Sequence, residues 1–567
     1  MIQRAFVYLA SEIRGLQSAA YILAGAAFLS SLLALGRDRM FAHLFGASTT
    51  LDVYNAAFRI PDLIFVGTAA LVSVYILIPE LARRNEEEQK KYFDTVIAGF
   101  SLFAVAVAIV AAFCAPAFLQ ILFPKLVALG YLEQLVMLTR IMLLQPILLG
   151  LSNILAAVTQ VRGRYALYAV SPLLYNLGIL AGAAFLYPEF GLSGLAWGVV
   201  LGALMHMAIQ LPSVISDGYF ARLPRIHDYK DLFSTVFVSL PRALALSMTQ
   251  ISFLGLTAIA GVLAPGSIAV FVFAFNLQAV PLAIIGASYS VAAFPTLFSA
   301  LSKGKTEEFL DHVATAARYV FFWSIPATAL IIVLRAHLVR VILGSGRFDW
   351  TDTRLTAAVF ALLSISLVAQ GLSLLLIRGY YAAGRTFIPF VISALTAFAT
   401  IVLAVAFLSA GGNHMVVETV AELMRLQGVS GATVLALGAA YALASVMGTI
   451  ALAIHFNRRY PGFFRKIATA VAESSIAGLA ALLGAYLMLS IVGPLETGST
   501  TFSVFLKGLA GGLTGIIVAA LAYWVVGSRE FQETWAAMHG RFLKRIWPFE
   551  SPVAVAGSAE ENTPGAA

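Results

Sequence analysis

The sequence predicts a polytopic α-helical membrane protein, and three observations support that prediction. Of the 567 residues, 60% are hydrophobic and only 11% are charged, and the mean hydropathy is +0.90, far more apolar than a soluble protein. Stretches of about 20 apolar residues, long enough to cross roughly 30 Å of hydrocarbon as a helix, recur along the whole chain. The alternating segments of a membrane β-barrel do not recur. We therefore expect an all-α fold with about 14 transmembrane helices.

The predicted spans are apolar runs bounded by glycine, proline or charged clusters. Charged clusters mark where the chain leaves the hydrocarbon, because a charge inside the bilayer is costly. Prolines within several runs, Pro61, Pro241 and Pro281 among them, predict kinked helices. In order along the chain, the predicted spans are 17–36, 52–82, 92–123, 131–160, 164–187, 191–214, 230–263, 267–301, 309–335, 353–382, 386–410, 429–456, 466–492 and 502–526.

The two ends of the chain are expected to lie outside the spans. Residues 1–16 lack the apolar core and cleavage site of a signal peptide, so they predict a short interfacial segment, with the first span as the uncleaved signal. Residues 528–550 alternate Phe, Trp and Leu with Arg, Lys and Glu, which predicts a helix anchored on the inner leaflet. Residues 551–567 are small and polar, so we expect them to be disordered. Residues 528–567 thus form a cytoplasmic amphipathic segment and tail.

The positive charge follows the loops between spans. The chain has a net charge of +8, and its cations lie mainly in short loops, which indicates membrane orientation and no nucleic-acid partner. Loops that follow the even-numbered spans hold 17 cations, between Arg83 and Lys466, whereas loops that follow the odd-numbered spans hold about eight, half of them in 335–354. By the positive-inside rule, the even-numbered loops and both termini are cytoplasmic.

A faint internal repeat predicts the domain organisation. Gly46 and Pro61 are 15 residues apart, as are Gly266 and Pro281, and each pair is followed by Ser-Val, a second proline and a basic loop. The copies fall in the second and eighth spans, which predicts duplicated six-helix lobes with the substrate site between them, as in many transporters. The predicted domains are an N-lobe at 17–226, a C-lobe at 227–460 and two further helices at 461–527.

Charged side chains gather where the first span ends. Arg37, Asp38 and Arg39 close that predicted span. A charged group near the bilayer centre costs about 2.5–3.5 kcal/mol on insertion scales, so such groups usually face a bundle interior or a watery cavity. Arg140 stands alone in the fourth span, and we favour a structural role for it.

The charges of the second span share one helix face. Asp52 lies seven residues before Arg59, and Asp62 lies three residues after it. One interpretation is that the first-span charges snorkel to the headgroups while Arg59 and Asp62 form a local ion pair. The interpretation that we favour is a cationic cavity for an anionic substrate. Arg242, next to Pro241 in the seventh span, would contribute to this cavity from the second lobe.

The sequence offers no constellation for catalysis. The histidines are scattered without metal-ligand spacing, and the single cysteine, Cys114, lies in an apolar run. No P-loop and no Gly-x-Ser-x-Gly elbow occurs. We therefore expect no enzyme, no metal site and no cofactor. The energy for transport would come from a gradient, a partner or consumption of the substrate.

Four segments form a series in the sequence, namely FGASTTLDVYNAAFRIPDLI (45–64), LPRALALSMTQIS (240–252), ILGSGRFDWTDT (342–353) and IRGYYAAGRTFIP (377–389). In order and spacing they resemble the MviN/MurJ lipid II flippases, over roughly residues 17–526. The resemblance implies the fold of the multidrug/oligosaccharidyl-lipid/polysaccharide exporter superfamily, two six-helix lobes with a final helix pair that forms a groove for the lipid tail. It also implies movement of the undecaprenyl-pyrophosphate-linked peptidoglycan precursor across the bacterial inner membrane by alternating access.

The resemblance carries over some site residues and not others. It implies Arg37 and Asp38 as an arginine–aspartate pair of the cavity and Asp52 as its acidic residue at the start of the second span. At Gly384 the sequence lacks the acidic residue of the family's pattern, which leaves a sodium site there without its carboxylate. The positions where the family has arginines and this chain does not are Ser31, Phe65 and Asn276.

The predicted cavity therefore has a mixed lining. We expect Arg59 and Arg242 to replace part of the missing positive charge. The expected partners are a polyprenyl-pyrophosphate-linked glycan lipid and membrane lipids, with a monovalent cation or the membrane potential for coupling, and we expect a monomer. The candidate substrate-binding residues are Arg37, Asp38, Asp52, Arg59, Asp62, Arg242, Gln250 and Asn276.

Two other functions stay open on the sequence alone. A flippase for another polyprenyl-linked oligosaccharide, or a drug/ion antiporter of the same superfamily, would account for the neutral residues at the three arginine positions. A non-transporting scaffold that recruits cell-wall enzymes would tolerate removal of the charges at Arg37, Asp52 and Arg59.

Overall fold

The computed structural model describes residues 16–72, 74–409, 415–424, 426, 428–495 and 498–538. This part of the chain consists of helices and their connections and contains no strand, so the predicted all-α fold is confirmed. The predicted interfacial segment 1–16 lies outside the described residues except for its last residue, and so does the predicted disordered end of the tail.

Helices in the first half of the chain correspond in order to the first six predicted spans. They are α2 (Leu16–Phe45), α3 (Thr49–Leu71), α4 (Val74–Ala82), α5 (Glu86–Leu122), α6 (Pro124–Ala128), α7 (Leu132–Met142), α8 (Leu144–Val161), α9 (Tyr165–Ala181), η1 (Gly182–Leu186), α10 (Tyr187–Phe190), α11 (Leu192–Ala208) and α12 (Leu211–Ser216).

Helices in the second half correspond to the remaining spans and to the amphipathic segment. They are α13 (Tyr229–Gly261), α14 (Ser267–Leu282), η2 (Ala283–Ala287), α15 (Ser288–Ser302), α16 (Thr306–Leu343), α17 (Trp350–Ile365), α18 (Leu367–Ala382), α19 (Phe387–Ser409), α20 (Met415–Leu423), η3 (Ala432–Val434), α21 (Leu435–Arg459), α22 (Phe463–Val492), α23 (Thr501–Val526) and α24 (Arg529–Met538).

The structure differs from the sequence prediction at the end of the first span. The predicted span stops at residue 36, whereas α2 continues to Phe45 and includes the three charged residues. The helix continues because Asp38 and Arg39 find partners on neighbouring helices inside the protein. By length and hydropathy, 11 segments of the described chain can cross a membrane, or 12 if α17 and α18, bent by 43°, form one span. The count of about 14 spans stays a prediction.

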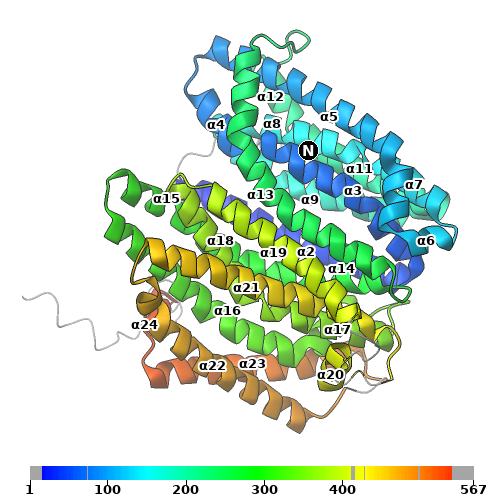
Figure 1. Cartoon of the computed structure of the whole chain (residues 1–567), viewed down its shortest axis with the longest axis vertical. Helices are drawn as coiled ribbons and strands as arrows, with labels where there is room; N and C mark the ends of the chain where they lie inside the picture. Colours follow the sequence, from blue (N-terminus) through cyan, green and yellow to red (C-terminus); the bar gives the residue numbers. More distant parts are fainter. Residues whose placement is uncertain are drawn as a thin grey trace, which may run out of the picture.

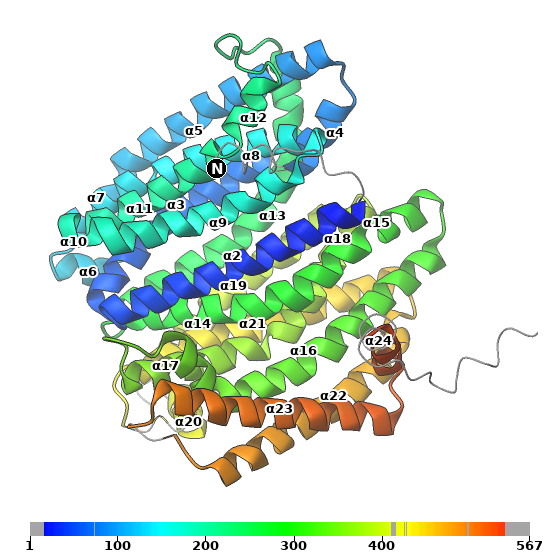
Figure 2. The ribbon, with the colours of Figure 1, turned by 180° about the vertical axis from the view of Figure 1, so that it is seen from behind.

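The hydrophobic core shows how the two halves of the chain meet. One large cluster of buried residues draws on both halves and lies toward the ends of α2, α14 and α17 that join the odd-numbered loops. Toward the other end the core divides into two clusters, one within α4, α5 and α8 and one within α15, α16, α18 and α21. Figures 1 and 2 show the halves converging near α6 and α14 and diverging toward α4 and α15. Helix α13 runs between the halves and packs on α3 and on α19.

The last helices form a separate layer on the second half. Helices α22 and α23 pack against each other and against α16 (Figure 2). Tyr523 on α23 donates a hydrogen bond to the carbonyl oxygen of Phe322 on α16, at 2.7 Å. Helix α24 follows and is held to α16 by an ion pair of 2.8 Å between Arg318 and Glu530. The predicted amphipathic helix after residue 528 is therefore present over its described length.

Candidate functional site

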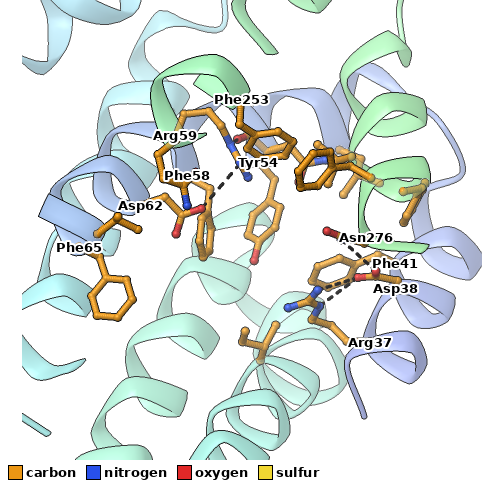
Figure 3. A pocket seen from close by; sticks show the side chains of 18 of the residues that line it. Arg37, Asp38, Phe41, Tyr54, Phe58, Arg59, Asp62, Phe65, Phe253 and Asn276 are labelled. Carbon is orange, nitrogen blue, oxygen red and sulfur yellow. Dashed lines mark hydrogen bonds and ion pairs between the residues drawn. The ribbon is translucent and has the colours of Figure 1, made fainter. Parts of the chain in front are cut away.

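A cavity of about 710 Å³ lies between the two halves of the chain. It is lined by α2, α3 and α9 from the first half and by α13 and α14 from the second. We call it the central cavity. Figure 3 shows that its charged side chains form two groups, one around Arg37 and one around Arg59. Both arginines therefore line an interior space instead of facing lipid, and Arg59 also forms the local ion pair with Asp62 that the other sequence interpretation expects.

The first group joins α2 to α14. Arg37 donates two hydrogen bonds to one oxygen of Asp38, from Nε at 3.0 Å and from Nη2 at 2.9 Å. The other oxygen of Asp38 accepts from Nδ2 of Asn276, at 2.9 Å (Figure 3). Asp38 is buried, and these charge-assisted bonds satisfy its carboxylate. Asn276 thus positions the aspartate from across the cavity, and part of the Arg37 guanidinium remains exposed to it.

The second group lies on α3 and contacts α13. The Nη1 atom of Arg59 is 3.7 Å from a carboxylate oxygen of Asp62, a long ion pair. Its Nε donates to the carbonyl oxygen of Asn55, at 2.9 Å. The guanidinium carbon lies 4.5 Å from the ring centre of Phe253, which gives it a cation–π contact with the second half of the chain. Arg59 is only 7% exposed, so this contact with an aromatic face replaces much of its lost hydration.

A proline in α3 lies between these charged residues. Pro61 has no N–H group, so the carbonyl oxygen of Ala57 loses its helical partner. The hydroxyl of Thr139 on α7 donates to that oxygen, at 3.1 Å. The helix therefore continues through the proline with its backbone satisfied, which fixes the position of Arg59 and Asp62 on either side.

Neutral residues complete the wall of the central cavity. Gln250 on α13 and Asn276 on α14 line it, as the sequence predicted, together with Phe65 on α3. Tyr54 and Tyr175 also contribute to the lining, although sequence reasoning did not select them, because tyrosine in an apolar run carries no distinctive signal. Ser31 lies on α2 and donates to the carbonyl of Ala27.

Two predicted site residues call for separate comment. Asp52 is 3% exposed and is not among the residues that line the central cavity. Its carboxylate accepts from the backbone N–H groups of Gly266, at 2.6 Å, and Ala269, at 2.8 Å, at the start of α14. Arg242 lies on α13, but its side chain is outside the described part of the structure.

The contacts of Asp52 belong to a set that closes one end of the central cavity. We call this set the seal. It is formed by the loops 46–48, 262–266 and 344–349 and by the helix ends beside them. Nη1 of Arg39 on α2 donates to the carbonyl oxygens of Val341 and Ile342 at the end of α16, at 2.7 and 3.0 Å. Asp352 at the start of α17 accepts from the N–H of Ala47, at 3.0 Å. In each of these contacts a charged side chain of one half binds backbone groups of the other half.

Glycines allow the backbones of the seal to approach this closely. Gly46, Gly266 and Gly346 all have positive φ, at 61°, 85° and 57°. A Cβ atom at Gly266 would overlap the carbonyl group of Ala47, and one at Gly46 would lie 2.6 Å from the carbonyl oxygen of Arg347. Only glycine accepts both the left-handed backbone and the missing space. The repeat found in the sequence places Gly46 and Gly266 here, but nothing in the sequence gave them this role.

A second cavity, of about 220 Å³, lies within the second half, between α13, α18, α19 and α21. Its polar lining consists of hydroxyl and amide side chains, and none of its lining residues carries a charge. Gly384, where the family pattern has an acidic residue, lies in the turn between α18 and α19 with open space around it. Among the described residues, no group of three His, Cys, Asp or Glu side chains is placed to hold a metal ion.

Comparison with known proteins gives a consistent result. The family model "Lipid II flippase MurJ" matches residues 41–509. The probable lipid II flippase MurJ of Buchnera aphidicola subsp. Acyrthosiphon pisum is 27% identical over 374 residues, 64% of this chain and 72% of that protein. The lipid II flippase MurJ of Burkholderia cenocepacia is 24% identical over 371 residues, again 64% of this chain and 72% of the relative.

The fold is also similar to solved structures. A structure of the lipid II flippase MurJ in an inward closed conformation matches with a TM-score of 0.70 at 20% identity, over 89% of this chain and 99% of that one. An inward-facing multidrug resistance transporter of the MATE family and the MOP superfamily matches with a TM-score of 0.62 at 14% identity, over 77% and 96%. At these identities the likeness concerns the fold alone.

Proposed function

Because the chain belongs to the lipid II flippase MurJ family, we propose that its central cavity carries the headgroup of lipid II across the membrane. The protein is a multi-pass membrane transporter that serves peptidoglycan biosynthesis at the bacterial inner membrane. The single observation that carries the mechanism is a charged cavity of about 710 Å³, enclosed by both halves of the chain and closed at one end by the seal.

The orientation follows from the charge of the loops. The seal is built from loops that follow odd-numbered spans, and the cation-rich loops lie at the opposite end. By the positive-inside rule the seal is extracytoplasmic, and both termini are cytoplasmic. The divided core at the cytoplasmic end supports a state in which the central cavity is accessible from the inner leaflet.

The cavity side chains suit a diphosphate-linked headgroup. Arg37 and Arg59 hold their aspartates with only some of their N–H groups, so each keeps donors for a phosphate oxygen. The contact between Arg59 and Asp62 is long, at 3.7 Å, so the guanidinium can also bind a phosphate oxygen. Asn276 and Gln250 offer neutral hydrogen bonds for the sugar part of the headgroup.

Transport requires the seal to open after the headgroup binds. Opening breaks the contacts of Asp52 and Arg39, and the inner ends of the two halves then approach each other. The lipid tail stays in the membrane along α22 and α23, whose outer faces carry exposed apolar residues such as Leu479 and Ile517. An inside-negative potential favours outward movement of an anion, by about 2.3 kcal/mol per charge for each 100 mV crossed.

We infer that the membrane potential, and not a bound monovalent cation, supplies the drive. The support for this is the second cavity, whose polar groups are all neutral and give a cation no carboxylate to offset its charge. Transport should then continue when sodium is replaced by choline at constant potential. A loss of transport on that replacement would contradict the inference.

The proposed function is tested by removing cavity charge. Arg59→Ala and Arg242→Ala should each slow headgroup translocation in proteoliposomes, while depletion of the protein in its host should accumulate the lipid-linked precursor on the inner leaflet. Accumulation of a different polyprenyl-linked oligosaccharide would support the alternative substrate that the neutral residues Phe65 and Asn276 suggest. Unchanged growth and precursor levels with both variants would indicate a scaffold.

A further inference from the structure

Arg140 is a charged residue outside the central cavity that the transport mechanism does not use. It lies on α7, and its side chain is exposed on the outer surface of the first half of the chain. Arg140 is eight positions after Leu132, the first residue of α7, which is a rise of about 12 Å along the helix. An exposed arginine at this depth faces the lipid part of the membrane, where an unpartnered charge is costly.

One hydrogen bond fixes the direction of this side chain. Pro116 on α5 has no N–H group, so the carbonyl oxygen of Ala112, four residues earlier, lacks its helical donor. The Nε atom of Arg140 donates to that oxygen, at 3.1 Å. This contact accounts for the structural role expected from the sequence. It uses one of five N–H groups, and the other four have no partner in the described part of the protein.

Glu133 lies near Arg140 on the same side of α7. The two residues are seven positions apart, which places them on one helix face with a rise of about 10 Å between them. Glu133 is exposed, and among the described residues its carboxylate has neither an ion pair nor a hydrogen bond. A cavity of about 510 Å³ is lined by both charged residues and by apolar side chains that include Pro116, Val136 and Met137. We call it the lateral pocket.

The order of the two charges along the membrane normal is informative. Glu133 is near the start of α7, at the membrane surface, and Arg140 is deeper. In a phospholipid headgroup the phosphate is next to the glycerol, and a terminal amine lies farther out. A lipid that places its phosphate at Arg140 therefore brings a terminal ammonium group toward Glu133. Because helical side chains point toward the helix N-terminus, the Arg140 guanidinium leans toward Glu133 and shortens the gap.

We propose that the lateral pocket binds one zwitterionic phospholipid that carries a primary ammonium group. The free N–H groups of Arg140 hold its phosphate, Glu133 accepts from its ammonium, and the apolar lining contacts the start of its acyl chains. An anionic lipid would satisfy Arg140 but would leave Glu133 beside its negative headgroup. Given the orientation proposed above, the bound lipid belongs to the outer leaflet, although the match of charge and depth does not depend on which leaflet it is.

The test measures lipid retained by the full-length purified protein. The protein is placed in nanodiscs of equal parts phosphatidylethanolamine and phosphatidylglycerol, extracted in mild detergent and analysed by native mass spectrometry. Wild type should retain phosphatidylethanolamine preferentially. Arg140→Gln should weaken that retention roughly ten- to a hundredfold, because it removes a charge-assisted phosphate contact. Glu133→Gln should shift the preference toward phosphatidylglycerol, since the repulsion of its headgroup is gone.

Controls separate the proposal from a structural effect. Glu189→Gln removes an exposed carboxylate from α10, at the same end of the first half but outside the lateral pocket, and should leave the lipid preference as in wild type. Arg140→Lys keeps a positive charge and should retain more phosphatidylethanolamine than Arg140→Gln. If Arg140→Gln fails to fold, Glu133→Gln still decides the matter. An unchanged lipid preference in Glu133→Gln would overturn the proposal, and so would loss of all lipid selectivity in Glu189→Gln. The readout is lipid retention, so the result is independent of transport.

Discussion

The seal and the central cavity lie next to each other but are built from different groups. The seal joins charged side chains of one half to backbone groups of the other, with glycines that admit the close approach and aspartates whose oxygens are occupied by N–H groups. The cavity presents two arginine–aspartate groups whose arginines keep unused donors. The difference separates two tasks. Substitutions in the seal should change the balance between conformations, and substitutions in the cavity should change the binding of the substrate.

The internal repeat sharpens this comparison. Gly46 and Gly266, the equivalent glycines of the two copies, both lie in the seal, and each adjoins an aspartate from the opposite half. Asp352 contacts the loop of Gly46, and Asp52 contacts the loop of Gly266. Both halves thus contribute an aspartate to the seal. The cavity differs, because all four charged residues of its described lining come from α2 and α3.

The largest effect is expected from Gly266→Ala. The new Cβ would overlap the backbone of Ala47, and the left-handed conformation at φ +85° adds strain. The steric overlap and the backbone strain should each destabilise the sealed state by about 1–3 kcal/mol. We expect the seal to remain open. The Oγ atom of Ser345 is buried in the seal, so a Ser345→Cys substitution in a Cys114→Ser background reports on its opening. In the Gly266→Ala variant this cysteine should react rapidly with an impermeant maleimide added from the outside.

Gly384→Ala is the matched control for this substitution. Gly384 also has positive φ, at 68°, but nothing lies within 4 Å of its Cβ position. The Gly384→Ala substitution should therefore lower the unfolding temperature through backbone strain, without changing the reactivity of the reporter. Equal reporter reactivity in Gly266→Ala and Gly384→Ala would contradict this expectation, because it would show that the close contact at Gly266 does not hold the seal closed.

Asp52→Ala is expected to have the next largest effect. It removes the acceptor for two buried N–H groups at the start of α14, Gly266 and Ala269. Hydrogen bonds to a charged group contribute about 1.5–3 kcal/mol, and the amides left behind are not satisfied, so the population of the sealed state should fall roughly 10- to 150-fold. The same maleimide reporter measures this change. Asp352→Ala removes one such contact and should have a smaller effect, which makes it the internal comparison.

The sequence predicted the fold better than the positions and roles of the charged residues. Apolar runs are long enough to mark helices without tertiary information, so nearly every predicted range falls on one helix or on consecutive helices. Charges on one face of a helix indicated the cavity at Arg59 and Asp62. The role of Asp52 was not visible, because its partners are backbone amides some 214 residues away, and backbone groups carry no signature in a sequence.

Arg59→Ala tests the cavity side of the comparison. Loss of the guanidinium removes its contact with Phe253 and a donor for the headgroup phosphate. The affinity for lipid II should fall by about 2 kcal/mol, roughly thirtyfold, whereas the reactivity of the Ser345→Cys reporter without substrate should not change. Lipid binding is measured by native mass spectrometry. Arg59→Lys keeps the charge and should recover part of the affinity. A large change in the reporter would mean that Arg59 acts on the seal instead.

The smallest effect is expected from Arg39→Ala, which distinguishes side-chain from backbone contributions to the seal. Arg39 lies two residues after Arg37 on α2, yet its Nη1 reaches the carbonyl oxygens of Val341 and Ile342, which end α16. These oxygens lack helical donors, so the arginine supplies their hydrogen bonds, and its positive charge interacts favourably with the negative end of the helix dipole. Water takes its place when the side chain is removed, and the sealed state should lose only about 1 kcal/mol, some fivefold in reporter reactivity. Arg37→Ala, two positions earlier on α2, should leave the reporter unchanged and weaken lipid binding. If both variants affected the reporter alike, α2 would respond as a single charged unit, and the division between seal and cavity would not hold along that helix.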